Sequence, residues 1–376
     1  MPGVTASVRA GSRLDRARAI LDELDLDGLL ISRAAAKRWL AGLVTHRGEE
    51  LTSGYSGTLL VTREAQVALA DGRYVEQAEA ECPGWEVRRT WKPIEAELPA
   101  IAGELRARRL GAEGKVLNHA DWDAIGAAGA ELVPVDGPLA ALRLVKDGDE
   151  LVAIERACVL TDACFSYLIS IVRPGMTERE VAWELEGWFR TNRAEDLAFE
   201  PLVLVGPRAA MPHGHPSEAV VTAGQPLLID FGCQVDGYRS DMTRTVFFGE
   251  PSPESRSRYE AVRQAQQRAF EAAAPGVIGA ELDRIAREHL ASAGLGEAFA
   301  HGLGHGIGLE THEAPMLKDW DRPLEAGMVF TLEPGVYFPG EIGIRIEDIA
   351  VLEEGGPRLL TASPREGIVV GEQQAA

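Results

Sequence analysis

The order of hydrophobic and polar residues over the first 145 positions predicts a small domain of helices and strands. Leu14–Leu26 has apolar residues at helical spacing, and Tyr74–Cys82 is also typical of a helix. Extended segments are expected at Gly28–Ser32, Gly57–Thr62, Gln66–Ala70 and Trp85–Arg88. We therefore expect an α/β domain in which helices cover a sheet.

The pattern changes at the charged turn Leu142–Glu150, and we place a domain boundary near residue 145. The first domain then spans residues 1–145 and the second spans residues 146–376. A long helix is expected over Asp149–Ile171, and two more over Pro253–Ala274 and Ala280–Ala293.

A fourth helix of the second domain is expected to begin at Thr177. Thr177 and Glu180 have the T-x-x-E spacing of a capping box, and Val181, Leu185 and Trp188 would line the apolar face. Strand-and-turn segments occur at Pro226–Phe231, Tyr238–Phe248, Met328–Glu333 and Gly343–Leu352. Helices and strands do not alternate one by one, so we predict the α+β class, with helices on one side of a curved antiparallel sheet.

Composition narrows the function classes. The chain has 376 residues, 45% of them hydrophobic, and 58 acidic against 38 basic residues give a net charge of −20. Such a negative field repels nucleic acid and anionic membranes, so we expect neither as a partner. The sequence shows no membrane span, no apolar signal-peptide core and no CxxC pair among its four cysteines. We expect a cytoplasmic protein with free, buried thiols.

The clearest chemical signal begins in LLIDFGCQVDGYRSDMTRTV, residues 227–246. An apolar strand ends in Asp230, Asp236-Gly237 predicts a hairpin turn, and the returning strand carries Asp241. A turn centred there places Asp241 opposite Gly232, as a diagonal neighbour of Asp230 on one sheet face. Two carboxylates so placed repel each other unless a cation lies between them.

The segment TLEPGVYFPGEIGIRIEDIAV repeats this arrangement. Glu333 closes an apolar strand, and the returning strand Ile342–Ile346 leads into Glu347. With His305 in GHGIG, the two hairpins supply four carboxylates and one imidazole. That ligand set suits two divalent ions such as Mn²⁺, Co²⁺, Fe²⁺ or Zn²⁺. Two ions ~3.5–4 Å apart can share a bridging water and polarise a carbonyl, which favours hydrolytic chemistry.

Four more histidines lie near these motifs in the sequence. His213 and His215 are in MPHGHP, and His301 and His312 flank His305. Loop histidines are about as often plain surface residues as functional ones. Beside a metal pair they can donate to a tetrahedral intermediate or bind substrate, although the role of His215 stays open.

Together these motifs resemble the pita-bread metallopeptidases, in the proline-specific branch of Xaa-Pro aminopeptidase and Xaa-Pro dipeptidase (prolidase). The matching stretches are PHGHP, LIDFG, GYRSDMTRT, HGLGHGIGLETHE, TLEPGVY and GIRIEDIAV. GYSGTLLVT and DGRYVEQAEAE resemble the branch's creatinase-like N-terminal domain. The resemblance implies a pita-bread second domain and a homodimer in which the N-terminal domain helps close the active site.

The resemblance also implies a role for each matching residue. The implied ligands of two divalent ions, Mn²⁺ first among them, are Asp230, Asp241, His305, Glu333 and Glu347, with Asp241 and Glu347 bridging. Glu333 would also shuttle the proton of the attacking water. The other implied roles are catalytic contacts from His213 and His312, and substrate binding by His301, Arg345 and Tyr337.

The expected function is hydrolysis of the Xaa-Pro bond in peptides with proline in second position, by attack of a metal-bridging hydroxide. The alternative is an Xaa-Pro dipeptidase that acts only on dipeptides. A methionine aminopeptidase, a creatinase-like C–N hydrolase and a non-enzymatic binding protein fit the motifs less well. Arg33–Ser53 departs from the branch's usual aromatic-rich pattern, so it gives no inference about substrate length.

Overall fold

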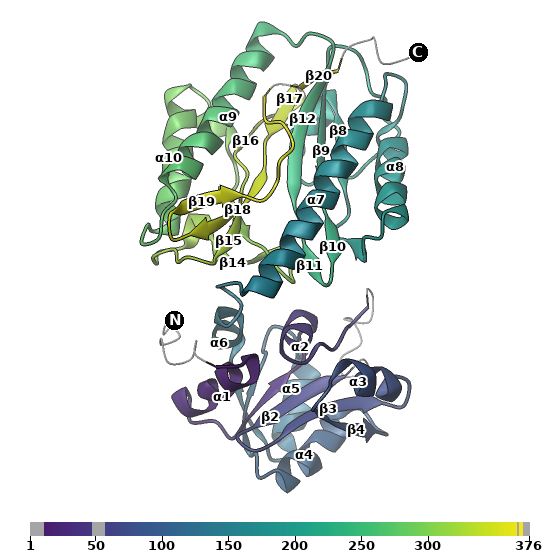
Figure 1. Cartoon of the computed structure of the whole chain (residues 1–376), viewed down its shortest axis with the longest axis vertical. Helices are drawn as coiled ribbons and strands as arrows, with labels where there is room; N and C mark the ends of the chain where they lie inside the picture. Colours follow the sequence, from purple (N-terminus) through teal and green to yellow (C-terminus); the bar gives the residue numbers. More distant parts are fainter. Residues whose placement is uncertain (1–10, 47–56, 367, 371–376) are drawn as a thin grey trace. The chain divides into compact units, whose positions relative to one another are not determined.

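The computed structural model describes residues 11–46, 57–366 and 368–370. The chain divides into two compact units, Met1–Arg143 and Leu144–Ala376, each with its own helices and strands (Figure 1). Three stretches interpreted from the sequence fall partly outside the described residues. They are the N-terminus, the end of Arg33–Ser53 and the start of GYSGTLLVT.

The first unit is built on a six-stranded mixed sheet of order β4-β3-β2-β1-β5-β6. Its strands are β1 Gly28–Ile31, β2 Thr58–Thr62, β3 Gln66–Asp71, β4 Glu86–Thr90, β5 Arg109–Ala112 and β6 Glu131–Pro134. Its helices are α1 Arg13–Glu23, α2 Ala34–Ala41, α3 Val75–Glu81, α4 Ile94–Glu104, α5 His119–Ala127 and α6 Asp136–Ala141. β1 and β2 are buried throughout because the helices cover the sheet, which confirms the predicted α/β domain.

The second unit contains the four helices expected from the sequence, within two residues at each end. They are α7 Gly148–Ile171, α8 Glu178–Thr191, α9 Pro253–Ala272 and α10 Gly279–Ser292. Capping side chains fix three of these starts: Asp147 for α7, Thr177 for α8 and Ser252 for α9. The strands lie between α7 and α8 on one side and α9 and α10 on the other (Figure 1).

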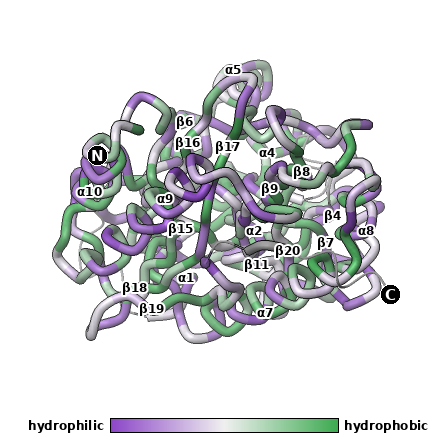
Figure 2. Tube along the Cα trace, turned by 90° about the horizontal axis from the view of Figure 1, so that it is seen from above, coloured by the Kyte–Doolittle hydropathy of each residue, from purple (hydrophilic) through white to green (hydrophobic). Residues whose placement is uncertain are grey.

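The buried face of α8 differs from the prediction at one position. Val181, Leu185 and Phe189 form the fully buried stripe, whereas Trp188 is only partly buried. Its large ring lies at the margin of the core, stacked on Tyr167 and edge-on to Phe189. The adjacent core fills the space between α7, α8 and the strands. Along α7, hydrophobic and hydrophilic residues alternate (Figure 2).

The strands of the second unit form four sheets. The strands are β7 Asp196–Leu197, β8 Leu202–Val205, β9 Pro226–Phe231, β10 Cys233–Val235, β11 Tyr238–Arg239, β12 Met242–Phe248, β13 His305–Gly306, β14 Glu313–Met316, β15 Val329–Leu332, β16 Gly335–Phe338, β17 Ile342–Arg345, β18 Asp348–Glu353, β19 Gly356–Leu359 and β20 Ile368–Val370. The strand orders within these sheets are β11-β10-β7, β20-β12-β9-β8, β14-β13-β15-β18-β19 and β16-β17. All pairings except β12 with β20 are antiparallel, which confirms the α+β class.

Two strands that the sequence predicts as continuous are each interrupted. Tyr238–Phe248 breaks at Ser240-Asp241, and Gly343–Leu352 breaks at Ile346-Glu347. At the second break the chain passes from the β16–β17 ladder to the β15–β18 ladder, and the Glu347 N–H donates to the Thr243 carbonyl at 3.0 Å. Each interruption therefore carries a predicted metal ligand.

Two further sequence expectations concern cysteines and membranes. All four cysteines are free and buried, as predicted. Among the described residues, no helix combines the length and the apolar character that a membrane span requires.

We predict that Gly343→Ala destabilises the second unit. A Cβ at Gly343 would lie 1.8 Å from the backbone oxygen of Ala209 in the short 3₁₀ helix η3 (Gly206–Ala210), and neither backbone can yield cheaply. The expected loss in free energy of unfolding is about 1–3 kcal/mol, measured by chemical denaturation. Gly187→Ala in α8 is the control. No atom lies within 4 Å of its Cβ position, so that variant should be neutral or more stable. Equal stability of both variants would contradict the prediction.

Candidate metal centre

The first hairpin has the register that its turn predicts. Asp236 and Gly237 both have positive φ, 50° and 88°, which suits a two-residue turn of the I′ type. The pairs Val235–Tyr238 and Met242–Phe231 continue one register, in which Asp241 lies opposite Gly232. Asp230 pairs with Thr243, so Asp241 is its diagonal neighbour, as predicted.

The second pair of acidic residues also shares one register. Leu332 pairs with Asp348 and Gly335 pairs with Arg345, so Glu333 and Glu347 lie opposite each other between two ladders. Thr243 joins the two hairpins, because its hydroxyl donates to Glu347 Oε2 at 2.6 Å. The carboxylates from both hairpins therefore meet in one place.

His305 completes a compact group of possible ligands. One ligand atom each from Asp241, His305 and Glu347 lies within 4.8 Å of the other two. His305 Nε2 is 3.3 Å from Glu333 Oε1 and 3.7 Å from Asp241 Oδ2. His305 Nδ1 is 3.1 Å from the Gly306 carbonyl, to which it can donate its proton. That tautomer directs the lone pair of Nε2 at the carboxylates, where a cation would bind.

Arg345 is a buried cation whose side chain contacts the carboxylates directly. Its guanidinium forms an ion pair with Asp230 and donates at 2.9 Å to both the Tyr337 hydroxyl and Thr243 Oγ1. The Tyr337 hydroxyl is in turn 2.9 Å from His301 Nε2, while His301 Nδ1 faces the Gly302 carbonyl at 2.8 Å. The chain from Asp230 to His301 is therefore continuously hydrogen-bonded.

Burial and mutual repulsion dominate the electrostatics of the carboxylates. Burial, with the charges of the other three acidic groups, holds the pKa of Asp241 well above its usual range. Burial and the charges of Glu333 and Asp230 do the same to the pKa of Glu347. Burial raises the pKa of Glu333 to about 8 and also raises that of Asp230, although Arg345 opposes both shifts.

The neighbouring imidazoles shift in the opposite direction. Burial lowers the pKa of His305 to about 3 and that of His301 to about 4, and it also lowers the pKa of His312. These rings are therefore neutral near pH 7, the state in which an imidazole nitrogen can bind a metal or donate its single proton.

The residues present fit a metal pair. Asp230 Oδ1 and Asp241 Oδ1 are buried and have no hydrogen-bond partner among the described residues. Buried polar atoms in this state cost free energy unless something binds them. Divalent cations prefer oxygen ligands with some nitrogen. The cluster offers four acidic groups, two of which have a carboxylate oxygen without a hydrogen-bond partner, and one neutral imidazole.

The remaining predicted residues lie around this cluster in different settings. His312 is exposed as a whole residue, but its ring lies 4.2 Å from that of His305, centroid to centroid, where it is partly desolvated. His213 is exposed, and it interacts electrostatically with both His301 and His312. His215 is 76% exposed and lies 3.7 Å from Glu200, so it points to a surface carboxylate.

Sequence reasoning missed Thr243 as a member of the site. Its hydroxyl connects Arg345 to Glu347, and its backbone carbonyl accepts from the Glu347 N–H. A signal was present, since Thr243 is two residues from Asp241 and therefore shares its face of the strand.

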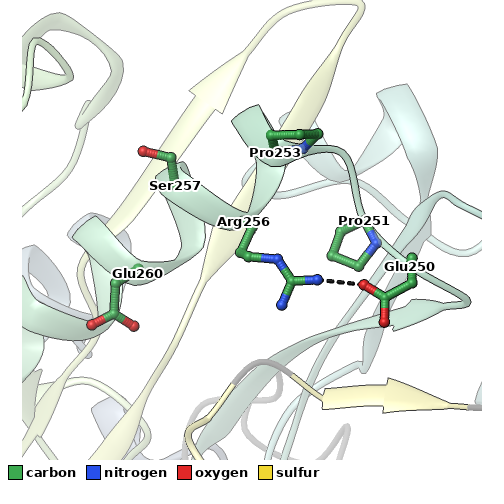
Figure 3. Close-up of a pocket in the computed structure, with 6 residues that line it drawn as sticks. All are labelled: Glu250, Pro251, Pro253, Arg256, Ser257 and Glu260. Carbon is green, nitrogen blue, oxygen red and sulfur yellow. Dashed lines mark hydrogen bonds and ion pairs between the residues drawn. The ribbon is translucent and has the colours of Figure 1, made fainter.

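A hollow on the surface near the start of α9 is separate from this cluster. It is lined by Glu250, Pro251, Pro253, Arg256, Ser257 and Glu260 (Figure 3). Arg256 points toward Glu250 and forms an ion pair with it. No predicted site residue lines this hollow, so the candidate site rests on the carboxylate cluster alone.

Comparison with known proteins places the chain in a family. Residues 152–354 match metallopeptidase family M24, and residues 13–145 match the creatinase/prolidase N-terminal domain. The chain therefore belongs to metallopeptidase family M24, with the pita-bread fold that the motifs predicted, and it is a metallopeptidase.

Solved structures of similar proteins cover nearly the whole chain. A Xaa-Pro dipeptidase from Bacillus anthracis is 36% identical with a TM-score of 0.89, covering 95% of this chain and 99% of that one. An X-Pro aminopeptidase from Thermotoga maritima is 35% identical with a TM-score of 0.86 and the same coverage of both chains. Among relatives compared by sequence, a Xaa-Pro dipeptidase of Pyrococcus furiosus is 42% identical over 237 residues, which are 63% of this chain and 68% of that protein.

We predict that the metal-free protein loses stability as the pH rises from 6.5 to about 8. Folding raises the pKa of Glu333 from 4.5 to about 8 and raises those of Asp241 and Glu347, so the folded state holds protons that the unfolded state has released. The lowered pKa values of His301 and His305 affect stability only below their usual 6.5. Thermal unfolding of chelator-treated protein should show a falling midpoint over this window.

Added Mn²⁺ should remove this loss, because a cation replaces the protons as the partner of the carboxylates. Glu333→Gln is the matched control, and it should reduce the pH dependence of the metal-free protein by the part that Glu333 contributes. A midpoint that rises with pH in the metal-free wild type would contradict the electrostatic account.

Proposed function

We propose that this metallopeptidase hydrolyses the Xaa-Pro bond at the N-terminus of peptides, as an Xaa-Pro aminopeptidase with two divalent ions. The convergence of Asp230, Asp241, His305, Glu333 and Glu347 in one cluster, three of them buried, carries the proposal. The names of three similar proteins, two Xaa-Pro dipeptidases and an X-Pro aminopeptidase, support the specificity for proline.

The five side chains of the cluster would hold the ions, with Asp241 and Glu347 between them. When bound, two divalent ions supply an activated water and a Lewis acid for the scissile carbonyl. Mn²⁺ is the first candidate, and Zn²⁺, Co²⁺ or Fe²⁺ also suits the ligand set.

Glu333 would move the proton of the reaction. Its partly buried carboxyl group, whose pKa is raised to about 8, can take a proton from the attacking water and return it to the proline nitrogen as that nitrogen leaves. The 3.3 Å between Glu333 Oε1 and His305 Nε2 keeps this carboxyl group beside the ligands.

His213 and His312 would stabilise the scissile carbonyl oxygen while negative charge develops on it. Both are exposed, as a substrate contact requires, and His312 lies against His305. The lowered pKa of His312 keeps its ring neutral near pH 7, so the ring donates a hydrogen bond without a full charge.

His301, Tyr337 and Arg345 would shape the side of the site that accepts proline. Arg345 and Tyr337 are buried, and the donors of Arg345 already engage Asp230, Tyr337 and Thr243. We therefore propose that Arg345 acts through Tyr337 and Asp230, and that His301, which is less buried, makes the direct contact with substrate.

Cleavage of dipeptides only is the second candidate. The names of the relatives from Bacillus anthracis and Pyrococcus furiosus, both Xaa-Pro dipeptidases, favour it. The proposal also includes a homodimer and a reducing cytoplasmic setting, the latter supported by four free, buried cysteines.

We predict that the metal-loaded protein cleaves Ala-Pro-Pro and a longer Xaa-Pro peptide, releasing the first residue. The test measures product from these peptides, from Gly-Pro and from Ala-Pro, after Mn²⁺, Co²⁺ or Zn²⁺ is added to chelator-stripped protein. Cleavage of dipeptides alone would establish the second candidate. No cleavage of any of them by protein with bound ions would refute the proposed function.

We further predict that Asp241→Ala removes bound metal and activity together. Loss of outer-sphere partners alone costs 10–100-fold in related metal sites, so loss of a bridging ligand should exceed about 100-fold. Asp236→Asn is the matched control, because Asp236 belongs to the same hairpin but pairs with exposed Arg156. It should keep both ions and full turnover.

His312→Ala should separate turnover from metal binding. We expect kcat to fall by roughly 10²–10³, the usual effect of removing one hydrogen-bond donor to the developing oxyanion, with both ions retained. Metal content measured beside kcat decides the assignment: loss of ions in this variant would identify His312 as a ligand instead.

A further inference from the structure

Glu178 is a fully buried acidic residue that the metal centre does not use. It occupies the first turn of α8, where the partial positive charge of a helix N-terminus favours a carboxylate. It is 0% exposed, a state in which an acidic group needs several hydrogen-bond partners. The identity of those partners indicates what the residue does.

The carboxylate of Glu178 binds both ends of one loop. Its Oε1 accepts from the Val205 N–H at 2.8 Å, and its Oε2 accepts from the Ser217 N–H at 2.8 Å and from Ser217 Oγ at 2.7 Å. Residues 205–217, which we term the His213 segment, therefore begin and end on the two oxygens of a single side chain.

Arg208 provides the compensating positive charge from inside the segment. Its Nε lies 3.1 Å and 3.0 Å from the two oxygens of Glu178, and its Nη2 donates to the His215 carbonyl at 2.7 Å. The Glu178–Arg208 pair thus reaches the backbone of the segment two residues after His213, as well as at its two ends.

The segment is also fixed against the strand that carries Arg345. Its first residues form η3, which packs against β17, and the Ala209 carbonyl approaches the backbone of Gly343 too closely for any Cβ. From this position His213 interacts electrostatically with His301 and His312. Glu178 therefore holds the segment that carries His213, and that segment packs on the strand that carries Arg345.

We propose that Glu178, together with Arg208, is a positioning residue that holds His213 in its catalytic place. The inference deepens the proposed function and rests on the role of His213 in it. A short exposed loop without such a clamp would sample many conformations, and the ordering cost would reduce turnover. The buried carboxylate instead fixes the loop before substrate binds.

The first experiment measures the loop without using activity. In Glu178→Gln the side chain keeps its volume, but an amide NH₂ replaces one accepting oxygen. Hydrogen exchange of residues 205–217 should then accelerate by about tenfold or more, because hydrogen bonds to charged groups are worth at least that factor. Thr177→Ala is the control, since it weakens the cap of the same helix through Glu180 and makes no side-chain contact with the segment. Unchanged exchange in Glu178→Gln would overturn the proposal.

The second experiment is a double-mutant cycle with His213→Ala on Mn²⁺-loaded enzyme. Glu178→Gln alone should lower kcat on the order of 10²-fold, as expected for a misplaced catalytic group, with metal content unchanged. In the His213→Ala background the same substitution should cost less than about threefold, because the group that it positions is gone. An equal cost in both backgrounds, or no cost in either, would overturn the proposal.

Two further measurements distinguish a folding defect, or a failure of the proposed function, from a failure of this proposal. If Glu178→Gln does not fold, Arg208→Gln removes the same clamp at a side chain that is 31% exposed, and it should reproduce both results. If the wild type cleaves no Xaa-Pro peptide, the proposed function fails, whereas the exchange result still decides whether Glu178 fixes the segment.

Discussion

The repulsion among four carboxylates, two buried and two partly buried, is the constraint on which this site depends. Asp230, Asp241, Glu333 and Glu347 converge from two hairpins, and the guanidinium of Arg345 is the cation that pairs with one of them. Without further positive charge these groups hold protons well above their usual pKa. On our proposal, divalent cations replace these protons at the point that the lone pair of His305 also faces.

The fold places three of these groups where its strand pairing is interrupted, whereas Asp230 lies within β9. Asp241 precedes β12, and Glu333 and Glu347 lie between the β15–β18 and β16–β17 ladders. Residues at such breaks are released from regular pairing, so their side chains can turn toward a shared centre while the flanking strands hold their backbones. Thr243 and Arg345 then connect the two hairpins by hydrogen bonds, which makes the site one unit.

Much of the fold and the ligand set could be predicted from the sequence because the signals are local. The Asp236-Gly237 turn fixes a register of period two, and that register alone places Asp241 beside Asp230. Capping residues such as Thr177 located helix starts in the same way. The strand breaks, the Arg345–Tyr337–His301 chain and the clamp on the His213 segment depend on contacts between distant segments, which periodicity does not encode.

The central claim is that this cluster binds two divalent cations, and metal stoichiometry tests it most directly. Chelator-stripped protein would be loaded with Mn²⁺ at pH 8, freed of excess metal and analysed for bound manganese per chain by elemental analysis. The account predicts two ions per chain. A value of zero, with the protein folded and the carboxyl groups protonated, would contradict it, and a value of one at saturating Mn²⁺ would contradict the dinuclear centre.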